Sequence, residues 1–153
     1  MSVAFRRDSD EEHKEPRFEL PLPSGPNLVT ERGLALIKAR IVELEQREAS
    51  AEEDSAREEA RRDLRYWKTR HATAQVAPAP GGDEVAFGTR VKIRVNGAER
   101  SLCLVGDDEA EPASGLISFS APLAKAILGA CVGEQLPFAG KEDAIVVLEI
   151  EPL

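Results

Sequence analysis

Two groups of carboxylates are the residues of this chain whose types and spacing could do chemistry. One group is spread over residues 43–59, where eight acidic side chains stand against two basic ones. The other is the consecutive trio Asp107, Asp108 and Glu109. Carboxylate oxygens are ligands for hard divalent cations. Three consecutive side chains point in different directions, however, so we do not expect the trio to bind a metal.

Cysteine and histidine offer no further site. Cys103 and Cys131 each lie in an apolar segment without the spacing of a metal site, and we interpret both as reduced core thiols of a cytoplasmic protein. His71 falls on an apolar helical stripe, where we expect a core or flanking residue. The sequence has no apolar leader and no run of ~18 apolar residues that could span a membrane, so we expect no membrane partner.

The acidic group over residues 43–59 lies around the turn between two amphipathic stretches. Thr30 has the marks of a helix N-cap, and apolar residues recur after it at spacings of 3 and 4. A second stripe follows the turn, and Asp54 or Ser55 is expected to cap its helix. Together the stripes predict an antiparallel coiled-coil hairpin over residues 30–76. They consist of Leu34, Ile37, Ile41 and Leu44, then of Ala60, Leu64, Trp67, His71 and Ala74.

Charge is sorted along this hairpin. The net charge is −6 over residues 43–59 and +6 over the flanking residues 30–42 and 60–76. The simplest explanation of the acidic tip is a solvated turn made of helix-favouring residues. The simplest explanation of the basic stem is that its side chains pair with acids along a helix face. Solubility does not require such sorting, and the stem holds only two acids for its eight bases. The pattern therefore suggests a probe that enters a partner.

The rest of the chain divides by composition. Residues 1–29 are rich in proline and poor in apolar residues, which predicts a flexible tail that becomes extended near its end. Residues 77–83 form a Pro/Gly linker. Because such a linker transmits few contacts, we expect the hairpin and the domain over residues 84–153 to unfold separately.

Residues 84–153 predict a small α+β domain. Alternating apolar residues and the turn Asn96-Gly97 indicate a β-hairpin. A short helix is expected over residues 122–128 and ends at Gly129. The predicted strands cover residues 91–95, 102–105, 116–119, 135–138 and 145–150.

Composition also excludes some nucleic-acid partners. The net charge of −8 argues against direct binding to the duplex backbone, which requires clustered positive charge. Aromatic residues make up only 5% of the chain, too few for a platform on which single-stranded bases stack.

Two segments of the C-terminal half carry a resemblance to a known family. The stretch Leu104-Val105-Gly106-Asp107-Asp108-Glu109-Ala110 and the stretch over residues 116–129 closely resemble the C-terminal domain of the bacterial GreA/GreB transcript cleavage factors. The match runs in register over about residues 85–150, and residues 74–76 resemble the family's junction. The resemblance implies an N-terminal antiparallel coiled coil followed by a C-terminal FKBP-like domain.

The resemblance also implies a function. It points to a transcription elongation factor that binds RNA polymerase at its secondary channel, an accessory factor that is not itself an enzyme. The implied docking residues are Asp107, Asp108, Glu109, Ser120 and Pro122. The implied tip carboxylates, which would help hold the polymerase's magnesium ion during cleavage of backtracked RNA, are Glu48, Glu52, Glu53 and Asp54. The basic stem, which would suit an acidic channel or extruded RNA, is Arg40, Arg61, Arg62 and Arg65. We expect a monomer with no cofactor of its own.

The sequence departs from the family at the tip. The family's Asp-x-x-Glu pair, in its Gly-Asp-x-x-Glu-Asn context, is missing between Arg47 and Glu59. The first arm, from Thr30 to Glu48, spans about 28 Å, less than the family's longer hairpin. The chain is therefore interpreted as a short-coiled-coil variant of the family.

Three functions remain open at this point. The first is a channel binder that promotes transcript cleavage. The second is a non-cleaving binder of the nucleoside diphosphate kinase regulator type, which competes with other channel factors. The third is an FKBP-like binding module with no tie to polymerase. Prolyl isomerisation is not expected, because only Phe87, Phe119 and Phe138 could line the aromatic pocket that it needs.

Overall fold

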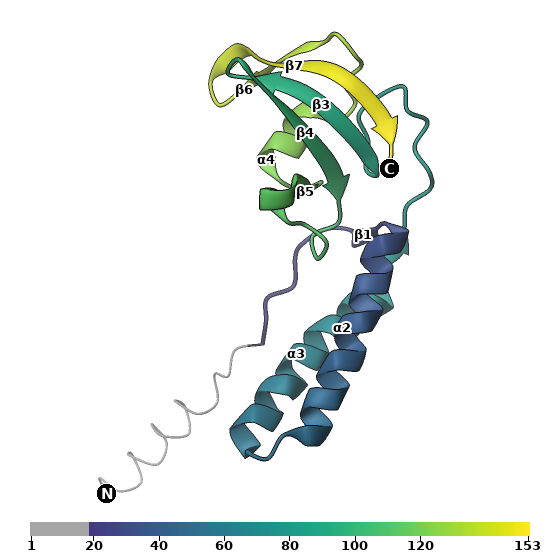
Figure 1. Cartoon of the computed structure of the whole chain (residues 1–153), viewed down its shortest axis with the longest axis vertical. Helices are drawn as coiled ribbons and strands as arrows, with labels where there is room; N and C mark the ends of the chain where they lie inside the picture. Colours follow the sequence, from purple (N-terminus) through teal and green to yellow (C-terminus); the bar gives the residue numbers. More distant parts are fainter. Residues whose placement is uncertain (1–18) are drawn as a thin grey trace, which may run out of the picture.

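The computed structural model describes residues 19–153. A two-helix hairpin projects from one side of a small sheet domain, with its turn at the end far from the sheet (Figure 1). This is the α+β architecture that the sequence predicts. Most of the predicted N-terminal tail, residues 1–18, lies outside the described residues.

The hairpin consists of α2 (Glu31–Ser50) and α3 (Asp54–Thr73). Each helix has 20 residues, which corresponds to about 30 Å at 1.5 Å per residue. Thr30 caps α2 as predicted, since its side chain accepts a hydrogen bond from the Gly33 N–H at 2.9 Å. The predicted cap of α3 by Asp54 or Ser55 is wrong. The helix begins one residue earlier, so the N-cap position falls to Glu53, whose side chain makes no capping hydrogen bond.

The two apolar stripes meet between the helices. Ile37, Leu44, Ala60 and Leu64 are buried, as the spacing predicts. The last inward position of α3 differs from the prediction, because His71 is exposed and its neighbour Arg70 is buried instead. Arg70 lies where the base of the hairpin meets the sheet domain, and carboxylates from that domain surround its guanidinium.

The sheet domain has five strands in the order β5-β4-β3-β7-β6. All neighbours are antiparallel except β4 and β5, which are parallel. The turn Asn96-Gly97 joins β3 to β4 with φ angles of 52° and 80°, in agreement with the prediction. The elements are β3 (Thr89–Val95), β4 (Ala98–Val105), a 3-10 turn η1 (Pro112–Ser114), β5 (Leu116–Ser118), α4 (Pro122–Ile127), β6 (Gln135–Phe138) and β7 (Lys141–Pro152).

The core of this domain lies between the sheet and α4. Its buried members include Ile93 and Leu104 from the central strands, Ile145 and Val147 from β7, and Ile127 from α4. Neither cysteine is fully buried. Cys103 is half-buried and Cys131 is exposed, so the prediction of core thiols is wrong for Cys131.

A short parallel ribbon, which the sequence does not predict, closes the base of the hairpin. Strand β1 (Leu28–Val29) enters α2, strand β2 (Gln75–Val76) leaves α3, and the two pair in parallel. Asn27 and Val29 are buried. The predicted tail over residues 1–29 is therefore corrected at its end, because its last residues belong to the hairpin base. No helix within the described residues is both long and apolar enough to cross a membrane.

Candidate functional site

The tip of the hairpin carries free carboxylates on a tight turn. Glu52 and Glu53 are exposed, and neither side chain makes a hydrogen bond or an ion pair within the part of the chain that the structure describes. The neighbouring Asp54 side chain is fully exposed and pairs with Arg57 at 2.9 Å. Arg57 also donates to the Ala51 carbonyl at 2.9 Å, so one guanidinium holds the turn in shape. The tip therefore presents negative charge to solvent on a fixed loop.

Glu48, the fourth predicted tip carboxylate, lies apart from these three. Its Oε1 accepts from Arg61 Nε across the hairpin at 3.2 Å. Three or more His, Cys, Asp or Glu side chains with metal-binding geometry do not gather anywhere in residues 19–153. The structure thus brings together Glu52, Glu53 and Asp54 and assigns Glu48 to a contact between the helices.

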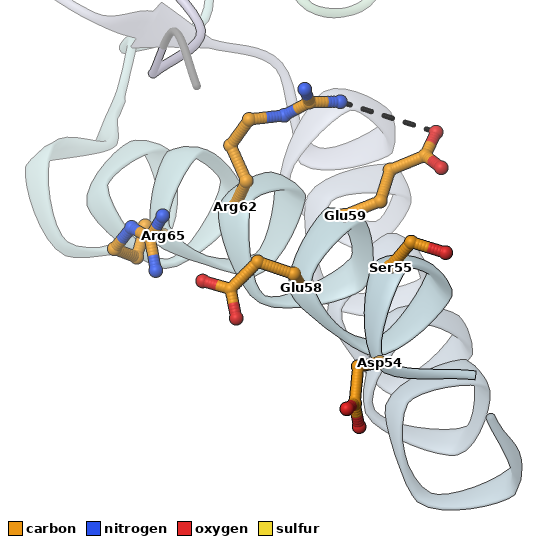
Figure 2. A pocket seen from close by; sticks show the side chains of 6 residues that line it. All are labelled: Asp54, Ser55, Glu58, Glu59, Arg62 and Arg65. Carbon is orange, nitrogen blue, oxygen red and sulfur yellow. Dashed lines mark ion pairs between the residues drawn. The ribbon is translucent and has the colours of Figure 1, made fainter. Parts of the chain in front are cut away.

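The outer face of α3 bears a shallow polar groove of about 570 Å³. Figure 2 shows acidic residues toward the tip and basic residues toward the base, with the ion pair between Arg62 and Glu59 at 4.0 Å. The Nε of Arg62 is buried and has no hydrogen-bond partner among the described residues. The lining residues are Asp54, Ser55, Glu58, Glu59, Arg62 and Arg65.

The basic stem is paired more fully than the sequence indicated. The acidic partners of its basic side chains lie in the tip half of the hairpin and in the segment before β1. These exposed pairs are Arg40–Glu43 at 2.8 Å, Arg61–Glu48 at 3.2 Å and Arg65–Glu19 at 2.7 Å. The hydrogen bond from Arg40 lowers the pKa of Glu43 below its ordinary value. Exposed pairs of this kind contribute little to stability, so the bases can exchange these partners for others.

The acidic trio after β4 lies at the junction between the domain and the hairpin. Asp108 accepts from Arg70 Nε at 2.5 Å and from the Tyr66 hydroxyl at 2.5 Å. Burial, followed by the hydrogen bond to Asp108, raises the pKa of Tyr66 well above its ordinary value. Arg70 also donates to the side-chain oxygen of Asn27 at 2.7 Å. A buried ion pair thus joins the sheet domain to the last turns of α3.

Glu109 makes the matching contact at the start of the other helix. It accepts from the Thr30 hydroxyl at 2.5 Å and from Arg32 at 2.8 Å, and its side chain is only 4% exposed. A carboxylate at this position is also favoured by the positive end of the α2 dipole. The loop after β4 therefore holds both helices of the hairpin, each at its base.

Asp107 connects this junction to the surface of the domain. Its Oδ1 accepts from Ser118 at 2.5 Å and from Ser120 at 2.9 Å, while its Oδ2 lies 3.9 Å from Arg70 Nη2. Pro122, another predicted docking residue, is exposed at the first position of α4. Docking by these residues stays a prediction.

Sequence reasoning missed the hairpin partners of the trio, which are Arg70, Tyr66, Thr30 and Arg32. A signal was available, because Arg70 is a base at helical spacing from Trp67 on an apolar stripe, and the trio is acidic without neighbouring bases. Pairing these two features would have required knowing that the two halves of the chain meet.

Comparisons with known proteins find sequences similar to part of this chain. The family described as "Transcription elongation factor, GreA/GreB, C-term" matches residues 79–152. The transcription elongation factor GreA of Nitratidesulfovibrio vulgaris (strain DP4) is 39% identical over 92 residues, which cover 54% of this chain and 55% of that protein. That of Helicobacter pylori (strain J99) is 42% identical over 74 residues, covering 43% and 45%. The chain thus spans about half the length of the curated relatives it matches.

Among solved structures, the chain is similar to the GreA factor homolog 1 (Gfh1) protein of Thermus thermophilus. The similarity has a TM-score of 0.38 at 19% identity, and it covers 83% of this chain and 99% of the other.

Proposed function

We propose, from the match of residues 79–152 to the GreA/GreB family of transcription elongation factors, that this protein regulates elongation by binding RNA polymerase at the secondary channel. The domain docks at the channel rim and the hairpin extends inward. The tip carboxylates then lie near the polymerase's magnesium ion and stimulate cleavage of backtracked RNA. The factor acts in the cytoplasm as a monomer without a cofactor of its own, and the polymerase supplies the active site.

The observation that carries this proposal is the position of three exposed carboxylates. Glu52, Glu53 and Asp54 lie at the end of a hairpin whose helices are each about 30 Å long, and its base is held by the domain that the family shares. A metal-bound water is activated for attack on phosphate, and additional carboxylate ligands help to position such a metal. The exposed tip supports this chemistry because, within residues 19–153, no ion pair has to be broken at Glu52 or Glu53.

A second candidate is a channel binder that does not stimulate cleavage. Two observations favour it: Glu48 is engaged with Arg61, and no group of metal-ligating side chains is assembled in residues 19–153. Such a factor would occupy the channel and exclude other channel ligands.

The deciding experiment measures RNA cleavage in a purified, backtracked elongation complex with and without the protein, and polymerase binding in the same reactions. Replacing Glu52, Glu53 and Asp54 together by Ala is expected to abolish stimulation and to leave binding intact. The matched control replaces Glu142, Asp143 and Glu149, three exposed acids of β7, by Ala. It changes the net charge equally and is expected to leave stimulation unchanged.

The outcomes separate the candidates. Binding without stimulation by the wild-type protein would favour the non-cleaving factor. No binding at all would refute both candidates and leave the FKBP-like module without a tie to polymerase. Loss of binding in the tip variant would contradict a role of the tip in cleavage alone.

A further inference from the structure

Arg70 is a buried charge at the base of the hairpin, on α3 and far from the turn. It is 3% exposed, and no other arginine or lysine is buried among the residues that the structure describes. An isolated buried charge is strongly unfavourable, so the surrounding groups must compensate for its desolvation.

The compensating groups come from three segments of the chain. Asp107 and Asp108 belong to the loop after β4, Asn27 precedes β1, and Tyr66 lies one turn earlier on α3. Asn27 also donates to the Arg70 carbonyl at 2.8 Å. Because a guanidinium is planar and its donors are fixed, these contacts define the direction of α3 relative to the loop.

The cluster is better suited to fixing geometry than to adding stability. A buried ion pair is often no more stabilising than apolar residues of the same volume, but its hydrogen bonds require particular directions. The covalent connection on this side is the segment 77–88, which contains Pro78, Pro80, Gly81, Gly82 and Gly88 and has no regular strand or helix. The angle between the hairpin and the domain therefore depends on contacts that are not covalent.

Small angular errors at the base become large at the tip. A swing of about 10° moves the end of a rod about 30 Å long by about 5 Å. Misplacing a reacting group by 1 Å can cost about a hundredfold in rate. A factor that acts through its tip thus needs a defined angle at its base.

We propose that Arg70, held by Asp108, Asp107 and Tyr66, is the positioning residue that fixes the angle of the hairpin relative to the C-terminal domain. Asp107 also bonds Ser118 and Ser120 at the domain surface, so the same cluster links that surface to α3. The structural part of this inference stands without the proposed function, and only its effect on the polymerase rests on that function.

The first test measures the angle directly in the full chain. A spin label on the exposed Cys131 and a second on Ala49→Cys at the tip report the distance between domain and tip, in a background where Cys103 is replaced by Ala. Wild type is expected to give one narrow distance distribution by pulsed electron paramagnetic resonance. Arg70→Lys, which keeps the charge and loses the planar donors, is expected to broaden it.

Arg90→Lys is the matched control, because Arg90 makes an exposed ion pair with Glu151 in the domain. It is expected to leave the distribution narrow. If Arg70→Lys loses its helical circular dichroism signal, it is unfolded, and Tyr66→Phe is used for the distance measurement in its place. This variant removes only the hydroxyl that donates to Asp108. A distribution as narrow as that of wild type in a folded Arg70→Lys or Tyr66→Phe variant would overturn the proposal.

The second test separates positioning from binding. In the backtracked complex, Arg70→Lys is expected to lower the maximal cleavage rate about tenfold or more, with little change in the half-saturating concentration of factor. An unchanged maximal rate would overturn the role in transcription. If wild type itself does not stimulate cleavage, the proposed cleavage function fails, and the distance measurement alone decides the role of Arg70.

Discussion

Thr30 shows how one hydroxyl can serve two parts of the molecule. Its Oγ1 accepts the Gly33 N–H at 2.9 Å and donates to Glu109 Oε1 at 2.5 Å. The cap of α2 and the anchor of Glu109 therefore depend on the same atom. An isosteric apolar residue would break both contacts at once and leave a buried carboxylate with one donor fewer.

Thr30→Val is expected to lower the free energy of unfolding by about 2 kcal/mol, of which about 1 kcal/mol is the lost cap and the rest the weakened contact to Glu109. Chemical denaturation followed by circular dichroism measures the change. Thr69→Val is the control, because the Thr69 hydroxyl bonds only the Arg65 carbonyl on an exposed face. It should change stability by less than about 0.5 kcal/mol, and an equal effect of both variants would contradict the double role.

Tyr66 makes stability depend on pH in the alkaline range. Its pKa is raised in the folded protein by burial and by the bond to Asp108, so the folded state retains the phenol proton where the unfolded state, with a pKa of about 10, releases it. Its contribution is complete below pH of about 10 and is lost as the pH rises further, by up to about 1.4 kcal/mol per pH unit.

The difference in unfolding free energy between wild type and Tyr66→Phe should therefore be constant up to about pH 9.5 and then change in favour of Tyr66→Phe. Urea denaturation at a series of pH values measures it. A difference that stays constant up to pH 11 would show that the phenol titrates normally.

At the scale of the elements, the loop after β4 depends on a glycine. Gly106 is buried, and a Cβ at this position would collide with the carbonyl oxygen of Leu28 in β1. The absence of a side chain thus allows the domain to approach the ribbon at the hairpin base. Without this approach, Asp108 and Glu109 could not reach α3 and α2.

Gly106→Ala is expected to cost about 1–3 kcal/mol through this overlap, and to speed amide hydrogen exchange at the start of α2 and the end of α3. Gly81→Ala is the control, since no atom lies within 4 Å of its Cβ position. It should be neutral or slightly stabilising. Equal exchange rates in the two variants would mean that the loop and the ribbon can separate without consequence.

The elements that the sequence predicts are those with a periodic signal. The stripes of α2 and α3 and the alternation in β3 extend over enough residues to be recognised, and the Asn96-Gly97 turn is recognised by its residue types. The ribbon of β1 and β2 has two residues per strand, too few for a period to show. The candidate site also has a predictable and an unpredictable part. The charges of Glu52, Glu53 and Asp54 can be recognised in the sequence, whereas the contact of Arg70 with Asp108 joins residues 38 positions apart.

On the scale of the whole molecule, the hairpin and the domain are connected twice, by the chain and by the loop over residues 106–109. The expectation of separate unfolding considered only the chain connection. Most of the stability of a helix in a protein comes from tertiary packing and not from intrinsic propensity, so we expect the hairpin to depend on the fixed base that Asp108 and Glu109 provide. We therefore expect the two halves of the wild-type protein to unfold together.

Trp67, the single tryptophan of the chain, lies in α3 and reports on the hairpin alone. Asp108→Asn is expected to lower the free energy of unfolding of the hairpin, measured by Trp67 fluorescence during denaturation, by about 3 kcal/mol. The amides of β3 and β7 are expected to stay protected from hydrogen exchange. Asp143→Asn, an exposed acid of β7, should leave both signals unchanged. If the Asp108→Asn variant lost both signals together, the domain would depend on the hairpin as well.

Because of the parallel ribbon, the length of the two helices can change without altering the contacts at the base of the hairpin. The chain enters α2 and leaves α3 at one point, and the two arms have equal length. Seven residues added to each arm would preserve the apolar stripes and move the turn outward by about 10 Å. Ribbon, loop and domain would stay as they are. Reach is thus a quantity that evolution or design can adjust in whole helical repeats, independently of how the protein attaches.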